Sequence, residues 1–184
     1  QAKHSSVRIL LRRISGEVTK MTKHSYSVLF VGTHNSGRSI MAEAILRQRG
    51  LGRFAAFSAG SHPAGQIDPL ALTQIQEARL QVEGLRSKSW DEFGRPDSPQ
   101  MDFVFYVCEA AARDATPAWP GSPVVAKWAM PDPLAVTGSE LAKKKAFHDA
   151  FMQLDWRVGL LISLPISGLD QLALERQMIN IGAS

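Results

Sequence analysis

The sequence predicts an α/β fold: a single three-layer domain in which helices flank a central four-stranded parallel sheet. From residue 25 onward, short apolar runs rich in β-branched and aromatic residues alternate with longer stretches whose apolar residues recur at helical spacing. The third run, FVFYV, is almost entirely apolar, which is typical of a parallel strand covered on both faces. Strands that alternate with helices favour a parallel, doubly wound sheet.

The first half of this domain provides two strands and two helices. Residues 26–31 (YSVLFV) predict the first strand, and a polar, glycine-containing turn leads from it into residues 40–47, whose apolar spacing predicts a helix. Residues 54–58 (FAAFS) predict the second strand, and residues 69–78 predict the second helix.

The second half of the domain also provides two strands and two helices. Residues 103–107 predict the third strand and residues 124–128 the fourth. Residues 140–164 form a long amphipathic stretch, because apolar residues recur there every three or four positions. Residues 168–181 predict a last short helix.

The net charge of +4 is concentrated at the N-terminus. The first 23 residues hold six basic residues and one acidic residue, whereas the rest of the chain holds 15 basic and 16 acidic residues. We therefore expect residues 1–24 to be a flexible, basic N-terminal extension, of which residues 1–20 supply no catalytic group, and residues 25–184 to be the domain. Because the extension is rich in arginine, an organellar presequence and a surface-binding arm are alternative interpretations of it. Met21 is a candidate for the first residue of the natural protein. The nearly neutral domain gives no reason to expect a nucleic-acid partner.

The composition excludes several classes of protein. With 45% hydrophobic residues in 184 positions, the chain has enough apolar material for one buried core. A single cysteine cannot form an intrachain disulfide, and no apolar run approaches the roughly 18 to 20 residues that span a bilayer. We therefore expect a cytoplasmic protein with no membrane partner.

The loop after the first strand is the place where a ligand is expected, because ligands of such folds bind beyond the carboxyl ends of the strands. The loop reads Gly32-Thr33-His34-Asn35-Ser36-Gly37-Arg38-Ser39. Glycines and small polar residues allow several backbone N–H groups to point at one spot, and the following helix offers its positive end. Arg38 adds a planar cation suited to a tetrahedral oxyanion. The loop therefore predicts a cradle for arsenate, phosphate or sulfate.

The sequence of this loop is close to two known loop types. It departs from the nucleotide-binding loop GxxxxGK[ST], because Arg38 stands where lysine is needed and the strand at 103–107 ends in Cys108 and Glu109 rather than an acidic metal ligand. A phosphatase-type loop has a strand-end nucleophilic cysteine, five further residues and then Arg-Ser. The loop of residues 32–39 matches the phosphatase-type pattern at every position except the first, which is Gly32.

Several separated segments decide between the two loop types. They are VLFVGTHNSGRSIMAEAIL, FSAGSHPAGQIDPLAL, GLRSKSWDEF, VCEAAA, PAWPG and KWAMPDP. Together, and in this order, they resemble the thiol-dependent arsenate reductases built on the low-molecular-weight protein tyrosine phosphatase fold. The resemblance runs from about residue 28 to the C-terminus and implies a role in arsenic resistance.

The resemblance also implies roles for individual positions. In family members a strand-end cysteine attacks the oxyanion, the loop amides and an arginine hold its oxygens, and an aspartate before proline protonates the leaving group. Gly32, Arg38 and Asp132 match these positions, with the loop of residues 33–37 between the first two. Ser39 matches the hydroxyl that lowers the pKa of the nucleophile.

The nucleophile is the one role left vacant. Gly32 has no side chain that can attack. The arsenate reductases also pass the reaction on through further thiols, and Thr116 stands where many relatives carry a second cysteine. Cys108 matches the first cysteine of that pair, so we expect it near the anion loop as a candidate redox residue. A buried cysteine is, however, most often a small core residue.

Other groups of the loop offer weaker alternatives for catalysis. Ser36 or Thr33 as nucleophile needs an adjacent base, and none is visible in the sequence. His34 can serve only if its side chain turns inward. The pair of His34 and His62 lacks further ligands at metal-binding spacing, so no metal and no cofactor are expected. Asn35 matches the family residue that braces the loop.

Three further residues have a functional and a structural interpretation. Asp132 lies between Pro131 and Pro133, which suits either a fixed general acid or a simple Asp-Pro turn. Arg86 and Lys88 either line the mouth of the site and attract anions or form a solvated face.

Three functions follow from this reasoning. The first is a pseudoenzyme of the arsenate reductase fold that binds a tetrahedral oxyanion but lacks the cysteine reaction. The second is an active arsenate reductase or phosphatase whose natural residue at position 32 is cysteine. The third is a non-catalytic regulatory or interaction protein. The resemblance implies a small oxyanion or phosphorylated substrate, and glutaredoxin or thioredoxin as partner.

Overall fold

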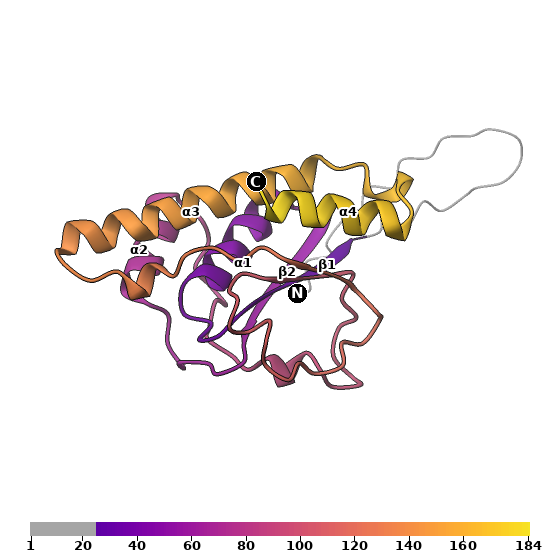
Figure 1. Cartoon of the computed structure of the whole chain (residues 1–184), viewed down its shortest axis with the longest axis horizontal. Coiled ribbons are helices and arrows are strands. Elements are labelled where there is room, and N and C mark those ends of the chain that lie inside the picture. The colour runs from indigo at the N-terminus through magenta and orange to yellow at the C-terminus, as the bar shows by residue number, and fades with distance from the viewer. Residues whose placement is uncertain (1–24) are drawn as a thin grey trace, which may run out of the picture.

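The centre of the molecule is a four-stranded sheet in the order β2-β1-β3-β4, in which every neighbouring pair is parallel (Figure 1). This computed structural model describes residues 25–184, so the expectation of an N-terminal extension lies outside the described residues. The strands are β1 (Tyr26–Gly32), β2 (Phe54–Gly60), β3 (Phe103–Tyr106) and β4 (Val124–Lys127). The predicted parallel α/β fold is confirmed.

Four helices accompany the sheet, each near its predicted place. They are α1 (Arg38–Arg49), α2 (Pro69–Glu77), α3 (Glu140–Ser163) and α4 (Gln171–Gly182). Side chains at three N-cap positions explain where helices begin, since Asp68, Ser139 and Asp170 each accept a hydrogen bond from a first-turn N–H group. Three short 3-10 helices were not predicted, because three residues carry no periodic pattern: η1 (Trp90–Glu92), η2 (Pro133–Ala135) and η3 (Ile166–Gly168).

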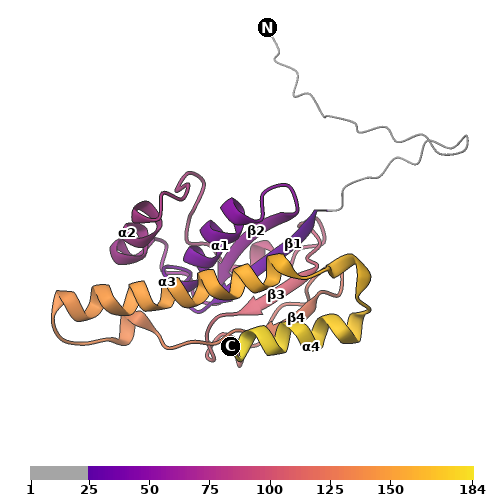
Figure 2. The same cartoon turned by 90° about the horizontal axis from the view of Figure 1, so that it is seen from above.

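One face of the sheet carries the larger core and the helices. Figure 2 shows α1 and α3 side by side over the sheet, with α4 running along β4. The apolar residues of α1, α3 and α4 pack there against alternate residues of β1, β3 and β4. Trp128 is fully buried in this core and stacks on Phe105, with ring centroids 3.9 Å apart. The helical layer therefore fixes α1 rigidly behind β1.

The opposite face is covered by the two connections that join β2 to β3 and β3 to β4. Its smaller core gathers Leu29 and Val31 of β1, Tyr106 of β3, and residues of η1 and of the segment that follows β3. Trp90 and Trp119 meet edge to face in this layer. Figure 1 shows this layer on the side of the sheet away from α3 and α4.

The strand order places the predicted loop at a crevice. β1 lies between β2 and β3, and the chain leaves β1 toward one face and β3 toward the other. Loops that diverge from adjacent parallel strands open a crevice at their carboxyl ends. The loop between β1 and α1 stands at this point.

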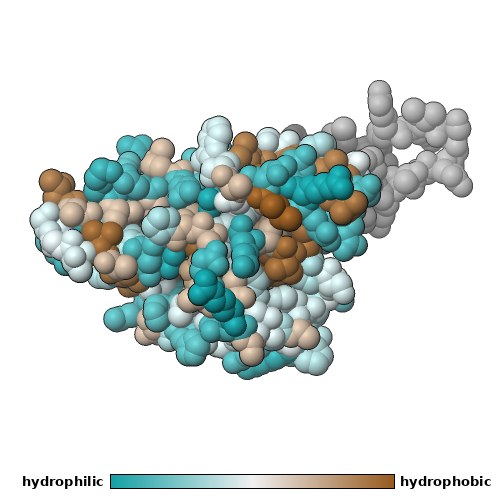
Figure 3. Space-filling model, in the orientation of Figure 1, coloured by the Kyte–Doolittle hydropathy of each residue, from teal (hydrophilic) through white to brown (hydrophobic). Residues whose placement is uncertain are grey.

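The surface of the described part mixes polar and apolar residues. Figure 3 shows hydrophobic residues in separate groups among hydrophilic ones on one face. Among residues 25–184, no helix has the length and apolar character needed to cross a membrane.

Candidate functional site

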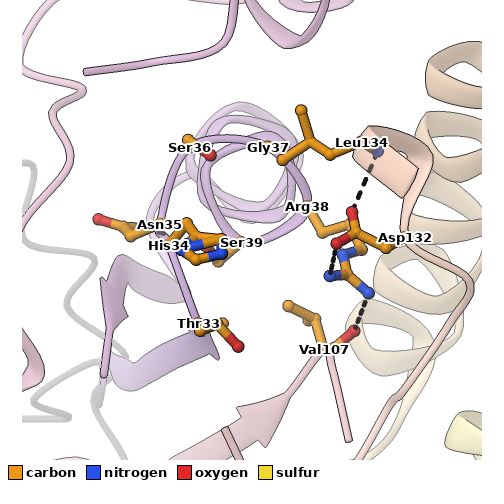
Figure 4. A pocket seen from close by; sticks show the side chains of 11 residues that line it. Thr33, His34, Asn35, Ser36, Gly37, Arg38, Ser39, Val107, Asp132 and Leu134 are labelled. Atoms are coloured by element: carbon orange, nitrogen blue, oxygen red, sulfur yellow. Dashed lines mark hydrogen bonds and ion pairs between the residues drawn. The ribbon is translucent and has the colours of Figure 1, made fainter. Parts of the chain in front are cut away.

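A hollow lies at the carboxyl end of β1, enclosed by the loop that leads into α1 (Figure 4). It holds about 280 Å³ of space including its open mouth. Its lining brings together Gly32, Thr33, His34, Asn35, Ser36, Gly37, Arg38, Ser39, Val107, Asp132 and Leu134. The loop residues and the distant Asp132, which the sequence grouped by resemblance, therefore share one hollow.

The loop is held from outside through its carbonyl groups. The segment that follows β2 donates four backbone hydrogen bonds to them: Ser61 N to Gly32 O at 3.1 Å, His62 N to Thr33 O at 2.8 Å, Ala64 N to His34 O at 2.9 Å and Asp68 N to Ser36 O at 2.9 Å. The Ser87 hydroxyl also donates to the carbonyl of His34, at 3.0 Å. These carbonyl groups therefore point away from the hollow, and the segment after β2 fixes the loop.

Asn35 connects the loop to three neighbouring segments. Its φ of 45° lies in the left-handed region, which asparagine tolerates better than most residues. Its Nδ2 donates to Ser39 Oγ at 3.0 Å and to Ser58 Oγ at 2.9 Å, and its Oδ1 accepts the N–H of Lys88 at 2.8 Å. One buried side chain thus holds the loop to α1, β2 and the segment before η1.

A buried ion pair lies behind Asn35. Glu43 of α1 is 1% exposed and Lys88 is 7% exposed, and Lys88 Nζ lies 3.3 Å from Glu43 Oε2. The Ser58 hydroxyl donates to the same carboxylate oxygen at 2.5 Å, while Arg47 pairs with Oε1. Burial lowers the pKa of Lys88, and the neighbouring Glu43 carboxylate opposes that shift. The pair therefore ties α1 to the segment before η1.

The location of Lys88 corrects a prediction. Lys88 neither lines the mouth of the hollow nor belongs to a solvated face, because it is buried behind the loop. Arg86 is exposed, pairs with Glu92 and does not line the hollow. Sequence reasoning also missed Glu43 and Ser58; the available signal was a carboxylate inside the apolar run IMAEAIL of the first helix.

Arg38 lies on the other side of the hollow, beside Asp132. Its Nη2 is 3.2 Å from Asp132 Oδ2, and its Nη1 donates to the carbonyl of Met130 at 2.7 Å. The side chain of Arg38 is only 12% exposed, so the guanidinium is held in place. Asp132 Oδ1 accepts the N–H of Leu134 at 3.1 Å and thereby caps η2. Figure 4 shows Arg38 and Asp132 side by side, across from the loop.

Gly32 ends β1 at the base of the hollow. A Cβ atom built there would lie 3.3 Å from Ser39 Oγ and 3.7 Å from the nearest atom of Val107. The second contact is ordinary, and the first requires a small shift of the hydroxyl. A side chain at position 32 would therefore stand next to Ser39 and inside the hollow.

The remaining candidates lie around the hollow. Cys108 Sγ is 3.3 Å from Thr33 Oγ1, but the residue is 4% exposed and packs in the core of the second face. His34 is exposed, and its Nδ1 lies 3.4 Å from the carbonyl of His62. The nearest carboxylate to His62 is that of Asp114, at 3.8 Å. Within residues 25–184 no group of three or more histidine, cysteine or acidic residues is arranged to hold a metal ion.

Known proteins share this fold and its sequence pattern. The family model described as low molecular weight phosphotyrosine protein phosphatase matches residues 27–155. The chain is 28% identical over 106 residues to a glutaredoxin arsenate reductase of Synechocystis sp., a match that covers 58% of this chain and 77% of the relative.

Solved structures of arsenate reductases share the fold of this chain. An arsenate reductase in the phosphate binding state superimposes with a TM-score of 0.62 at 26% identity, over 75% of this chain and 97% of that chain. The thioredoxin-dependent arsenate reductase of Corynebacterium glutamicum gives a TM-score of 0.55 at 24% identity, over 77% of this chain; the match spans only 62% of that protein. The chain therefore belongs to the low molecular weight phosphotyrosine protein phosphatase family, with arsenate reductases among its relatives.

Proposed function

We propose that this protein binds a tetrahedral oxyanion, such as arsenate, phosphate or sulfate, in the loop of residues 33–38 and does not run the cysteine reaction of its family. The observation that carries the proposal is the outward orientation of the loop carbonyls. A trans peptide unit is planar, and its N–H points opposite to its C=O. Outward carbonyls at positions 32, 33, 34 and 36 therefore direct the N–H groups of positions 33, 34, 35 and 37 into the hollow.

Two positive features add to these N–H groups. α1 begins at Arg38 and is 12 residues long, so the unpaired N–H groups of its first turn and its positive end face the hollow. The guanidinium of Arg38 supplies a full charge at the rim. Backbone donors, a helix N-terminus and an arginine fork together match the oxygens of a tetrahedral anion.

The cysteine reaction requires an atom that position 32 lacks. By the family resemblance, Gly32 stands at the place of the nucleophile, and no lone pair exists there to attack an oxyanion. Cys108 is the chain's single cysteine; its Sγ contacts Thr33 Oγ1 at 3.3 Å, but the residue is buried and is not among those that line the hollow. Binding can persist without this sulfur, because donors that hold the oxygens act independently of the group that attacks.

This protein offers a redox partner no accessible thiol, because its single cysteine is buried. One relative is named a glutaredoxin arsenate reductase and another a thioredoxin-dependent arsenate reductase. Exchange with such a partner requires an accessible thiolate. We therefore expect no arsenate reduction in the presence of either partner, and reduction at rates typical of active arsenate reductases would contradict the proposal.

The binding itself is tested by isothermal titration calorimetry with arsenate and phosphate. Replacing Arg38 with alanine (Arg38→Ala) should weaken binding by about 10- to 150-fold, because charge-assisted hydrogen bonds contribute about 1.5–3 kcal/mol. Arg49→Ala is the matched control: Arg49 ends the same helix and also bridges to a carboxylate, Asp155 at 2.7 Å, but lies outside the hollow. Equal affinity in Arg38→Ala and wild type, or no binding to wild type, would favour an interaction protein with an empty loop.

A further inference from the structure

Asp132 places a carboxylate on the rim of a hollow that is otherwise suited to anions. It lines the hollow, and its Oδ2 lies 3.2 Å from Arg38 Nη2. The titratable groups in the lining are Asp132, Arg38 and His34. An oxyanion that reaches Arg38 must therefore also come close to the Asp132 carboxylate.

The position of this carboxylate is fixed by its neighbours. Pro131 and Pro133 restrict the backbone on both sides, and Asp132 Oδ1 accepts the N–H of Leu134 at 3.1 Å. Arg38 is fixed as well, since its Nη1 donates to the carbonyl of Met130 at 2.7 Å. The carboxylate and the guanidinium thus form one unit that a ligand meets together.

An ionised carboxylate can only accept hydrogen bonds. A ligand oxygen that carries a proton can donate to Asp132, which converts a repulsive contact into a charge-assisted hydrogen bond. A ligand without a proton meets the full repulsion of a like charge in a confined site. At neutral pH phosphate and arsenate keep at least one proton, whereas sulfate keeps none.

We propose that Asp132 is a specificity-determining residue that selects proton-bearing oxyanions, hydrogen phosphate and hydrogen arsenate, and discriminates against sulfate. The inference rests on the proposed function, because it needs an oxyanion in the hollow. It adds a substrate class to that function: tetrahedral oxyanions that still carry an acidic proton.

The test compares anions of equal charge by isothermal titration calorimetry in slightly alkaline buffer. There hydrogen phosphate, hydrogen arsenate, sulfate and monofluorophosphate each carry two negative charges. Monofluorophosphate has the size and shape of hydrogen phosphate, but fluorine replaces the O–H group. Wild-type protein should bind the two proton-bearing anions about 10-fold or more tightly than sulfate and monofluorophosphate.

Replacing Asp132 with asparagine (Asp132→Asn) should remove this preference. The asparagine side chain has the same size and can still cap η2, but it is neutral and offers an N–H donor to sulfate. Sulfate binding should therefore strengthen, and the ratio of the phosphate and sulfate dissociation constants should come within about threefold of one. Asp68→Asn is the matched control, because Asp68 also precedes a proline and caps a helix through its side chain, but lies outside the hollow.

Two results would overturn the inference: wild-type protein that binds sulfate as tightly as phosphate, or a preference for phosphate that survives in Asp132→Asn. These results differ from a failure of the proposed function, in which none of the four anions binds. Thermal unfolding of Asp132→Asn and Asp68→Asn verifies that both variants are folded.

Discussion

At position 32 the backbone does not require glycine. Gly32 is not among the glycines with positive φ, and a Cβ built on it meets the Ser39 hydroxyl at 3.3 Å without a backbone clash. The conformational freedom of glycine therefore does not explain this residue. The functional effect of the missing side chain can be tested directly.

Gly32→Cys should introduce a reactive thiol. The sulfur would stand beside Ser39, at the N-terminus of α1 and near Arg38, three features that lower the pKa of a thiol. We expect slow hydrolysis of p-nitrophenyl phosphate and rapid alkylation by iodoacetamide near neutral pH. Steady-state kinetics and the pH dependence of alkylation measure these effects.

The control for this substitution is Gly37→Cys, another thiol in the same loop. A Cβ at Gly37 meets only the ring of Phe147, at 3.5 Å, so the variant should fold but should not hydrolyse the ester. A folded Gly32→Cys protein without turnover would show that the hollow has lost more than its nucleophile.

At the scale of elements, the loop is positioned by contacts from behind it. Asn35 holds it to α1 and β2, and the Glu43–Lys88 pair holds α1 to the segment before η1. Removing Lys88 leaves the buried Glu43 carboxylate with Arg47 as its remaining cationic partner. The shape of the hollow therefore depends on groups that do not line it.

Lys88→Met should destabilise the fold by about 1.5–3 kcal/mol, because the buried Glu43 carboxylate keeps Arg47 and Ser58 but loses one charged hydrogen-bond partner. Chemical denaturation measures this free energy of unfolding. Arg86→Met is the matched control: its ion pair with Glu92 is exposed, and the loss should be about 0–1 kcal/mol. Equal losses in both variants would mean that Lys88 does not support the loop as described.

At the scale of the whole molecule, β1 begins at the end of the sheet opposite the hollow. β1 enters at Tyr26 and reaches the hollow at Gly32. A seven-residue strand is about 20 Å long, so a segment that precedes β1 joins the domain at the end of the sheet opposite the hollow.

Deleting residues 1–24 should therefore leave oxyanion affinity unchanged, within about twofold. Calorimetry of the full chain and of residues 25–184 under identical buffer and salt conditions tests this. A larger loss of affinity on deletion would assign a binding role to the basic N-terminal residues.

Much of the fold follows from local sequence patterns. Within residues 25–184, short apolar runs located the four strands and helical apolar spacing located the four helices, with ends that differ from the structure by no more than three residues. The 3-10 helix η2 was missed because it is too short to show a period, although a turn was one of the two interpretations of the Asp-Pro pair that begins it. The prediction of an oxyanion cradle likewise came from the composition of one loop.

The sequence by itself determined the α/β class, the order of its elements, the glycine at the end of β1, and a loop whose small residues and arginine suit an anion. Only the tertiary structure decided that Lys88 is buried, that Asn35 holds three segments together, and that Arg38 pairs with Asp132. Periodicity reports which residues face the core within one element. The burial and pairing of a charged or polar side chain depend on partners 45 to 94 positions away, as for Glu43 with Lys88 and Arg38 with Asp132, and these meet only when the chain folds.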